Sequence, residues 1–326
     1  MADPTYPQAV DPKGKLGDSP YYAAPNPGAR YDGYVVDQTW HRYSATEHDV
    51  WRTLFERQRD LLPGRVDQPF LDGLKALMGG LGPEAAASIP DFRDINRVLA
   101  ARTGFEIVAV PGLIPEAQFF AMLADRVFPV TRWIRTPEEL DYLEEPDLFH
   151  DLFGHVPLLT DPTFADFIQT YGKAGLAALE TGDIGRLARL YWYTVEFGLI
   201  RRPGEDLKIY GAGVVSSATE TRFALESPSP NRLMFERERV LATDYRIDDF
   251  QETYWVIEDY AQLFHALDGY AGGDLAALYR LLDLRPEHAP GAVLPTDRVL
   301  HRGDGAYHRG RKAAAYQSGR GTGRAA

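Results

Sequence analysis

The segment LYWYTVEFGLI, residues 190–200, constrains the fold most strongly, because it is apolar on almost every side. A helix with this pattern has no face for solvent, so we expect it in the core. Glu196 lies within the segment. A buried carboxylate is costly unless it is paired or binds a metal. The fold must therefore bring Glu196 a partner, which is either a core arginine or a metal ion.

Two histidines of a second apolar segment, EPDLFHDLFGHVPLL (145–159), are candidates to share that partner. His150 and His155 stand among Phe, Leu and Val residues, so we expect both to be largely buried and to need partners for their ring nitrogens. Five residues correspond to about 140° on a regular α-helix, which would point the two rings apart. Either a π-turn brings them onto one face, or the helix ends at Gly154 and the chain turns His155 back. The residues alone leave open whether the two histidines share a metal.

The absence of cysteine narrows the chemistry of any metal site. The chain has 326 residues and no Cys, so the ligands must come from His, Asp or Glu. Two histidines and one carboxylate suit a non-haem Fe(II) centre with open positions, and they also suit a catalytic zinc. The His-Glu-x-x-His spacing of zinc proteases is absent. An iron enzyme, a zinc-dependent hydrolase and a metal-stabilised scaffold without catalysis remain as the three alternatives.

The rest of the chain predicts one mainly α (α+β) domain with a few short strands. A capping box begins at Ser44, and Ser217 begins a later helix. The predicted elements are helices at 69–78, 90–102, 115–126, 162–179 and 184–200, a strand at 105–110, short strands with a tight turn at 207–217, and a strand-then-helix at 254–267. We predict an irregular arm at 1–31, a catalytic domain at 32–295 and a disordered basic tail at 296–326.

Charge and hydropathy exclude several classes of partner. The formal net charge of −12 argues against general nucleic-acid binding, although RNA contact by the basic tail is a minority alternative. No apolar run reaches the length of a membrane span, and the first residues lack a signal-peptide core. We therefore expect a cytoplasmic protein with no membrane contact.

Three segments carry a resemblance to a known family: EEPDLFHDLFGHVPLL, LYWYTVEFGL and IYGAGVVSS. They resemble the pterin-dependent aromatic amino acid hydroxylases, and the similarity runs from about residue 37 to residue 264. The resemblance implies a helical basket with few strands, Fe(II) held by His150, His155 and Glu196, and a tetrahydropterin (tetrahydrobiopterin or a related pterin) as cosubstrate with O₂. It is greatest for bacterial phenylalanine 4-monooxygenases, which implies conversion of L-phenylalanine to L-tyrosine. Tryptophan or tyrosine hydroxylation is the alternative within the family.

The resemblance also implies a substrate site. Arg135 would clamp the substrate carboxylate, a task suited to the planar guanidinium fork, and Asp147 would orient it. Pro146, Trp192 and Phe197 would form the walls of the aromatic pocket. Residue type alone would make Arg135 a surface residue and the three others plain core.

Further residues are implied in the pterin site and around the iron. In the loop PGLIPEAQFF (111–120), Phe119 would stack on the pterin, while Gly112 and Leu113 would offer backbone groups. Asp151 would reach the pterin through water. Ser216 would support the substrate and the iron ligands, with Glu220 and Tyr191 close by.

The two chain ends imply a simple assembly. The arm is too short for the regulatory domain of animal family members, and the tail has no heptad pattern that would form a coiled coil. We therefore predict a monomer that needs no obligate protein partner.

Overall fold

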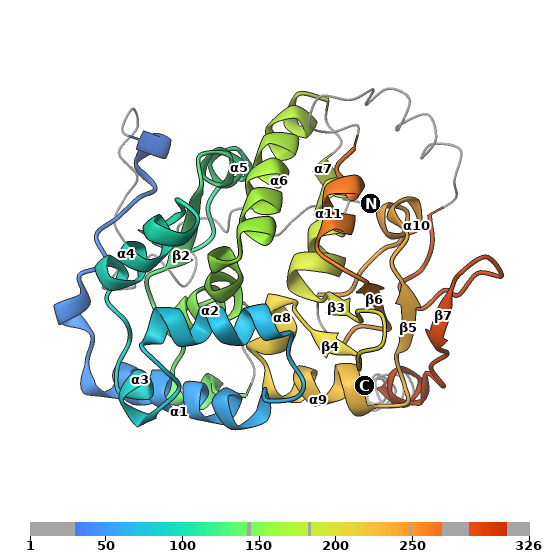
Figure 1. Ribbon diagram of the computed structural model, residues 1–326, viewed down its shortest axis with the longest axis horizontal. Helices are drawn as coiled ribbons and strands as arrows, with labels where there is room; N and C mark the ends of the chain where they lie inside the picture. The colour runs from blue at the N-terminus through green and yellow to red at the C-terminus, as the bar shows by residue number, and fades with distance from the viewer. Residues whose placement is uncertain (1–29, 142–144, 182–183, 248, 269–286, 312–326) are drawn as a thin grey trace, which may run out of the picture.

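The computed structural model describes residues 30–141, 145–181, 184–247, 249–268 and 287–311 (Figure 1). The α-helices are α1 (Ala45–Leu61), α2 (Gln68–Met78), α3 (Pro83–Ala86), α4 (Phe92–Arg102), α5 (Glu116–Ala124), α6 (Pro162–Thr181), α7 (Ile184–Tyr191), α8 (Ala212–Val215), α9 (Ala218–Glu226), α10 (Arg237–Leu241) and α11 (Ala261–Ala266). None of these described helices is long and apolar enough to cross a membrane.

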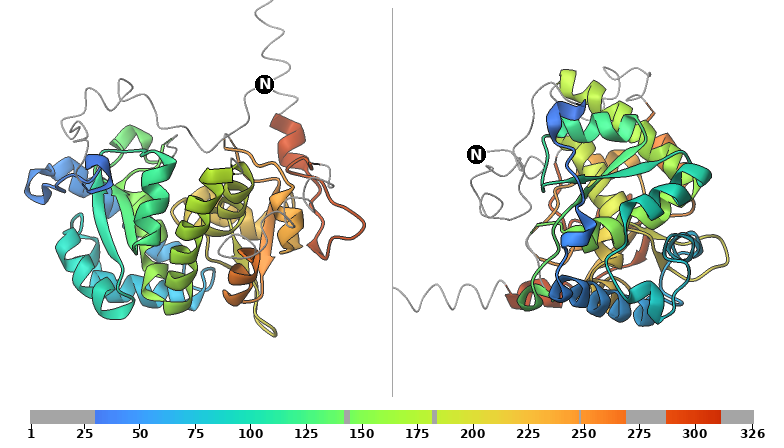
Figure 2. Two further views of the ribbon diagram at one scale, coloured as in Figure 1. Left: turned by 90° about the horizontal axis from the view of Figure 1, so that it is seen from above. Right: turned by 90° about the vertical axis from the view of Figure 1, so that its left-hand side faces the viewer.

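The strands form two small sheets. β1 (Glu106–Val110) and β2 (Val127–Thr131) pair in parallel, with α5 as their crossover. The second sheet has the order β4-β3-β6-β5-β7, with β3 (Leu199–Ile200), β4 (Lys208–Ile209), β5 (Asn231–Met234), β6 (Thr253–Ile257) and β7 (Val299–His301). Seen from above, the first sheet lies toward one end of the molecule and the second toward the other, with α6 between them (Figure 2). The predicted fold class, mainly helical with a few short strands, is confirmed.

Several local predictions are also confirmed. The side chain of Ser44 accepts from the backbone N–H of Glu47, and the Glu47 carboxylate accepts from the Ser44 backbone, which completes the capping box. The Ser217 hydroxyl accepts from the backbone N–H of Glu220 at the start of α9. The strand-then-helix predicted at 254–267 is β6 followed by α11.

Two predicted elements are only partly correct. The helix predicted at 184–200 ends as α7 at Tyr191, a π-helical turn follows at Trp192–Glu196, and Leu199 begins β3. The strands predicted at 207–217 are limited to β4, because 212–215 forms the helical turn α8. A Cβ on Gly211 would lie 2.5 Å from the carbonyl oxygen of Glu196, so the close contact between the two segments requires glycine there. Tertiary packing overrides the β propensity of the valines.

The domain boundary predicted at residue 295 requires a correction. Residues 299–301 form β7, which pairs antiparallel with β5, and residues 306–311 are helical. His308 is only 5% exposed. The physical reason is that β7 covers the edge of β5, which would otherwise expose unpaired backbone groups. The predicted disordered tail therefore does not include residues 299–311, while 312–326, and residues 1–29 of the predicted arm, lie outside the described residues.

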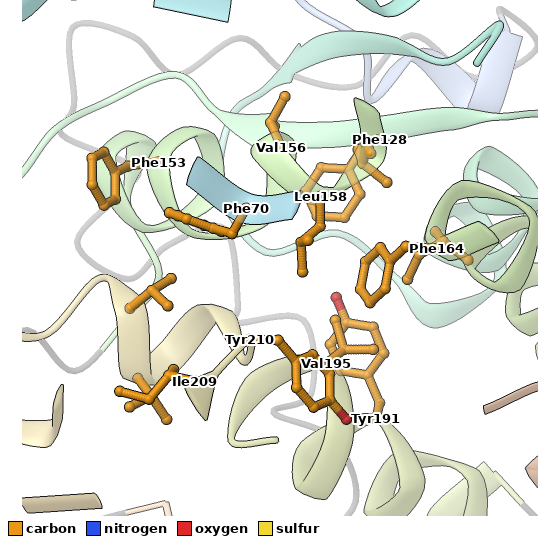
Figure 3. Packing of buried hydrophobic residues seen from close by; sticks show 14 of the residues in the cluster. Phe70, Phe128, Phe153, Val156, Leu158, Phe164, Tyr191, Val195, Ile209 and Tyr210 are labelled. Atoms are coloured by element: carbon orange, nitrogen blue, oxygen red, sulfur yellow. The ribbon is translucent and has the colours of Figure 1, made fainter. Parts of the chain in front are cut away.

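The core between the two ends of the molecule is rich in aromatic rings (Figure 3). The side chains of Phe70 from α2, Phe128 from β2 and Phe153 gather with Tyr191 at the end of α7. Phe153 stacks on Phe149 with ring centroids 4.8 Å apart. Close packing of this kind tolerates little displacement, so it fixes the segments that carry the two candidate histidines and Glu196.

Candidate active site

Both segments that carry the candidate iron ligands are π-helical. One turn runs from His150 to His155 and the other from Trp192 to Glu196. A π-helix brings residues five apart onto nearly the same face, and the Nε2 atoms of His150 and His155 lie 3.1 Å from each other. The two alternatives for the five-residue spacing are thus decided in favour of the π-turn.

The two histidines and Glu196 form one compact group. The Nε2 of His155 lies 3.2 Å from Oε1 of Glu196, and the Nε2 of His150 lies 3.6 Å from Oε2. Three ligands at right angles, each about 2.1 Å from a metal, would lie about 3 Å from one another. Three electron-pair donors converging this closely repel each other unless a cation or a proton lies between them. The residues therefore fit a facial two-histidine, one-carboxylate metal site.

Electrostatics favour metal binding at this group. Burial lowers the pKa of His150 to about 4, so its imidazole is neutral at pH 7. Burial opposes charge on His155, but attraction to Glu196 outweighs it and raises the pKa of His155. Burial likewise opposes charge on Glu196, yet His155 and His150 lower the pKa of Glu196. Glu196 therefore favours positive charge at this position, which a bound cation would supply.

Ser216 sets the tautomer of His150. The Ser216 hydroxyl donates to the carbonyl of Ala212 at 2.8 Å, so its oxygen accepts from Nδ1 of His150 at 3.0 Å. The Nε2 of His150 is then unprotonated and faces the metal position. The supporting role that the resemblance implied for Ser216 stays a prediction, and this contact supports it.

Gly154 brings α8 close enough for this contact. A Cβ at Gly154 would lie 2.9 Å from the carbonyl oxygen of Ala212, which is the acceptor of the Ser216 hydroxyl. The glycine between the two histidines therefore serves close packing against α8.

The half-buried Arg135 and the fully buried Asp147 form an ion pair that is linked to the backbone of His150. Nε of Arg135 donates to Oδ2 of Asp147 at 2.8 Å, and Nη2 donates to Oδ1 at 2.9 Å. Burial would raise the pKa of Asp147, but Arg135 outweighs it and lowers that pKa. Oδ1 of Asp147 also accepts from the backbone N–H of His150 at 3.0 Å. Among the described residues, none accepts from Nη1 of Arg135, so that group is available to an anion.

Of the three residues predicted to form the walls of the aromatic pocket, Trp192 and Phe197 lie side by side. The rings of Trp192 and Phe197 have centroids 4.8 Å apart, and both side chains are half-buried. Pro146 is half-buried next to Asp147 in the chain. Trp192 also stacks on Tyr245 at 4.6 Å. Its indole N–H donates to Oε1 of Gln251 at 3.0 Å.

The predicted pterin residues lie on two segments. Gly112 is buried and Leu113 half-buried in the loop between β1 and α5. The Phe119 ring on α5 lies 6.0 Å from the Tyr191 ring, and the Tyr191 ring lies 6.2 Å from that of His155. Tyr191 thus connects the predicted pterin helix with an iron ligand.

Asp151 and Glu220 have protein partners of their own. The Asp151 carboxylate accepts from the backbone N–H of Thr131 at 2.7 Å, and burial raises the pKa of Asp151 to about 7. Glu220 is buried and accepts from the hydroxyl of Tyr254, not from Ser216. Burial raises the pKa of Glu220 to about 7. Asp151 therefore ties the π-turn to β2, and Glu220 ties α9 to β6.

Comparison with known proteins places these features in a family. The family model for biopterin-dependent aromatic amino acid hydroxylases matches residues 36–281, which include every residue of the site described above. The chain belongs to this family. The predicted family resemblance and the predicted need for iron and a pterin are thereby confirmed.

Relatives in this hydroxylase family match over most of the chain. A phenylalanine-4-hydroxylase of Caulobacter vibrioides is 52% identical over 283 residues, covering 87% of this chain and 92% of the relative. The crystal structure of Chromobacterium violaceum phenylalanine hydroxylase with bound iron(III) and 7,8-dihydrobiopterin matches with a TM-score of 0.76 at 50% identity, covering 84% of this chain and 94% of the other. Another structure of that enzyme, with iron and phenylalanine bound, has a TM-score of 0.74 at 49% identity, covering 82% and 94%.

Two contacts of this hydroxylase site have no counterpart in the sequence predictions. Gln251 and Tyr245 hold Trp192, although neither follows a recognisable motif. Gln251 lies 59 residues from Trp192 in the chain. The one available signal was an amide two residues before the apolar and aromatic strand β6, where a polar side chain that becomes buried needs partners.

Proposed function

We propose that this protein hydroxylates L-phenylalanine at the para carbon to give L-tyrosine, with O₂ and a tetrahydropterin as cosubstrates and Fe(II) as the metal. The observation that carries this proposal is the group of His150, His155 and Glu196 together with the half-buried cation of Arg135, which pairs with the buried Asp147. Similarity to phenylalanine-4-hydroxylases over most of the chain supports phenylalanine over the tyrosine and tryptophan alternatives.

The residues around the metal position have separate tasks in this proposal. His150, His155 and Glu196 hold Fe(II) through one face, which leaves other positions open. When bound, Fe(II) and the reduced pterin together activate O₂. Ser216 keeps His150 in the ligating tautomer, and the surrounding aromatic core excludes bulk water.

Arg135 and the aromatic walls position the amino acid. The Nη1 group of Arg135 binds the substrate carboxylate, while Asp147 holds the guanidinium plane. Trp192, Phe197 and Pro146 form an apolar pocket for the ring. Phe119, Gly112 and Leu113 bind the pterin, and Asp151 reaches it through water. Placement of ring, metal and pterin is the main contribution of the protein.

Anaerobic reconstitution tests the proposal. The protein is loaded with Fe(II) or with Zn(II), then given O₂, tetrahydropterin and one of phenylalanine, tyrosine or tryptophan, and the products are identified by mass and retention time. We expect tyrosine from phenylalanine with Fe(II) alone, and no product when pterin or O₂ is omitted. A clear preference for tryptophan, or 3-hydroxyphenylalanine as the main product, would contradict the substrate assignment. Turnover with Zn(II) in the absence of O₂ would contradict the oxygenase class.

We also propose that the enzyme works as a monomer in the cytoplasm. Both are expectations from the sequence analysis, and each can be measured directly on the full chain. Light scattering of the full chain should give the mass of one copy, and fractionation of cells should place the activity with the cytoplasmic marker. A tetramer, or activity in the membrane fraction, would contradict it.

A further inference from the structure

Trp192 is held from outside its own helical turn. It lies four residues before the iron ligand Glu196 in the same π-turn, and one face of its ring is stacked on Tyr245. The indole N–H is a donor only, and it donates to Oε1 of Gln251 at 3.0 Å. The plane of the indole is therefore set by two residues that lie more than fifty positions further along the chain.

Gln251 is itself rigidly placed. Its side chain belongs to a residue that is 1% exposed, and Nε2 donates to the carbonyl of Arg246 at 2.9 Å. Because the indole requires an acceptor and the Arg246 carbonyl requires a donor, the amide has one orientation that satisfies both. An apolar residue of the same length would leave the indole N–H without this acceptor and the Arg246 carbonyl without this donor.

The C-terminal segment 299–311 holds the residues next to Gln251. Oδ1 of Asp249 accepts from the Tyr307 hydroxyl at 2.9 Å and from Nη1 of Arg311 at 3.2 Å. The Tyr307 ring lies 5.2 Å from Phe250, which stacks on Phe223 at 4.5 Å. Pairing of β7 with β5 anchors the beginning of the same segment. A continuous set of contacts thus runs from the C-terminal segment through Asp249 and Gln251 to Trp192.

We infer that Gln251 is a positioning residue for Trp192, and that the C-terminal segment 299–311 acts through Asp249 to fix Gln251, so that both determine which aromatic ring the pocket accepts. This inference rests on the proposed function, because it takes Trp192 as a wall of the substrate pocket. Gln251 and the residues of the C-terminal segment do not take part in catalysis directly. They act by fixing the orientation of the Trp192 indole.

A double-mutant cycle separates this role from general stability. Gln251→Met keeps the length of the side chain and replaces the amide oxygen with a thioether sulfur, which is a much weaker acceptor, while Trp192→Phe keeps an aromatic ring and removes the N–H donor. In the wild-type background we expect Gln251→Met to raise the KM for phenylalanine about fivefold and change kcat less than twofold, in line with the loss of one buried hydrogen bond. The ratio of kcat/KM for tryptophan to that for phenylalanine should rise. In the Trp192→Phe background the same change should have almost no effect on KM.

Two further variants complete the test. Gln169→Met is the matched control, because Gln169 also makes side-chain hydrogen bonds, to Ala124 and Arg126, but on α6. It should leave the KM and the ring preference unchanged. Tyr307→Phe removes only the hydroxyl that donates to Asp249, and it should raise the KM about twofold. An equal effect of Gln251→Met with and without the indole N–H would overturn the inference, as would an unchanged KM.

A readout without turnover keeps the inference separate from the proposed function. The chain has five tryptophans, so the ¹⁵N-labelled, zinc-loaded protein should give five indole N–H signals, and Trp192→Phe assigns the one of interest. Gln251→Met should shift that signal and speed its exchange with solvent, while Gln169→Met should not. An unmoved signal would overturn the positioning role even if the enzyme is active. Absence of phenylalanine turnover in the wild type would contradict the proposed function and leave the indole measurement to decide the contact.

Discussion

Replacing Arg135 with lysine tests how the amino-acid end of the substrate is held. The guanidinium uses Nε and Nη2 on the fully buried Asp147 and keeps Nη1 for an anion. A lysine ammonium keeps the charge but has no planar fork, so it cannot hold Asp147 through two parallel bonds and still present a fixed donor to a substrate. We expect Arg135→Lys to bind phenylalanine much more weakly and to keep its iron.

The size of the effect follows from the number of contacts that are lost. One charge-assisted hydrogen bond contributes about 1.5–3 kcal/mol, which corresponds to a fall in kcat/KM of about 10- to 150-fold. The fall should come mainly from KM, because Arg135 binds a part of the substrate that does not react. Asp147 also accepts from the backbone N–H of His150, so the iron content shows whether the change spreads to the metal site.

The assay is steady-state hydroxylation at saturating pterin, with iron measured on the same preparation. Arg132→Lys is a suitable control, because the buried Arg132 lies in the same segment but donates to the carbonyl of Asp37. An Arg135→Lys variant with normal KM and normal iron would refute the clamp. Loss of iron with unchanged KM would assign Arg135 to the metal site.

Three further outcomes are expected. His155→Ala should abolish turnover and greatly weaken iron binding, measured by metal analysis after dialysis, because it removes one of three protein ligands; normal iron and activity would refute the shared site. Gly154→Ala should lower the free energy of unfolding by about 1–3 kcal/mol and weaken iron binding, because the new methyl group displaces the Ala212 carbonyl that holds Ser216. For Glu220, the folded-state pKa of about 7 lies above its ordinary value of 4.5, so the unfolded state loses the proton first and wild-type stability falls as the pH rises between these values. Glu220→Gln removes this dependence. Between pH 5 and pH 8, the free energy of unfolding of the variant, measured by urea denaturation, should therefore rise relative to that of the wild type by on the order of 2 kcal/mol. A difference in free energy that stays the same at the two pH values would contradict this.

The sequence predicted the chemistry of the centre better than its geometry. An apolar segment around Glu196 and two histidines in an apolar surrounding, with no cysteine in the chain, already made a buried site of imidazole and carboxylate one of the alternatives, beside a core arginine as the partner of Glu196. These inferences depend on residue type and near neighbours, and so do the capping box at Ser44 and the start of α9 at Ser217. Such signals depend only on residues that are neighbours in the chain, so they can be recognised without knowledge of the fold.

Features that depend on distant contacts were decided by the tertiary structure. The π-turn at His150–His155, which the sequence left as one of two alternatives, lies where α8 packs against Gly154. The C-terminal segment is ordered because β5 offers it an edge, although its own composition predicts disorder. Local sequence determined which side chains are available to the metal and the substrate, whereas long-range packing decided how they are aimed, because the orientation of a buried side chain depends on neighbours that the chain brings together only when it folds.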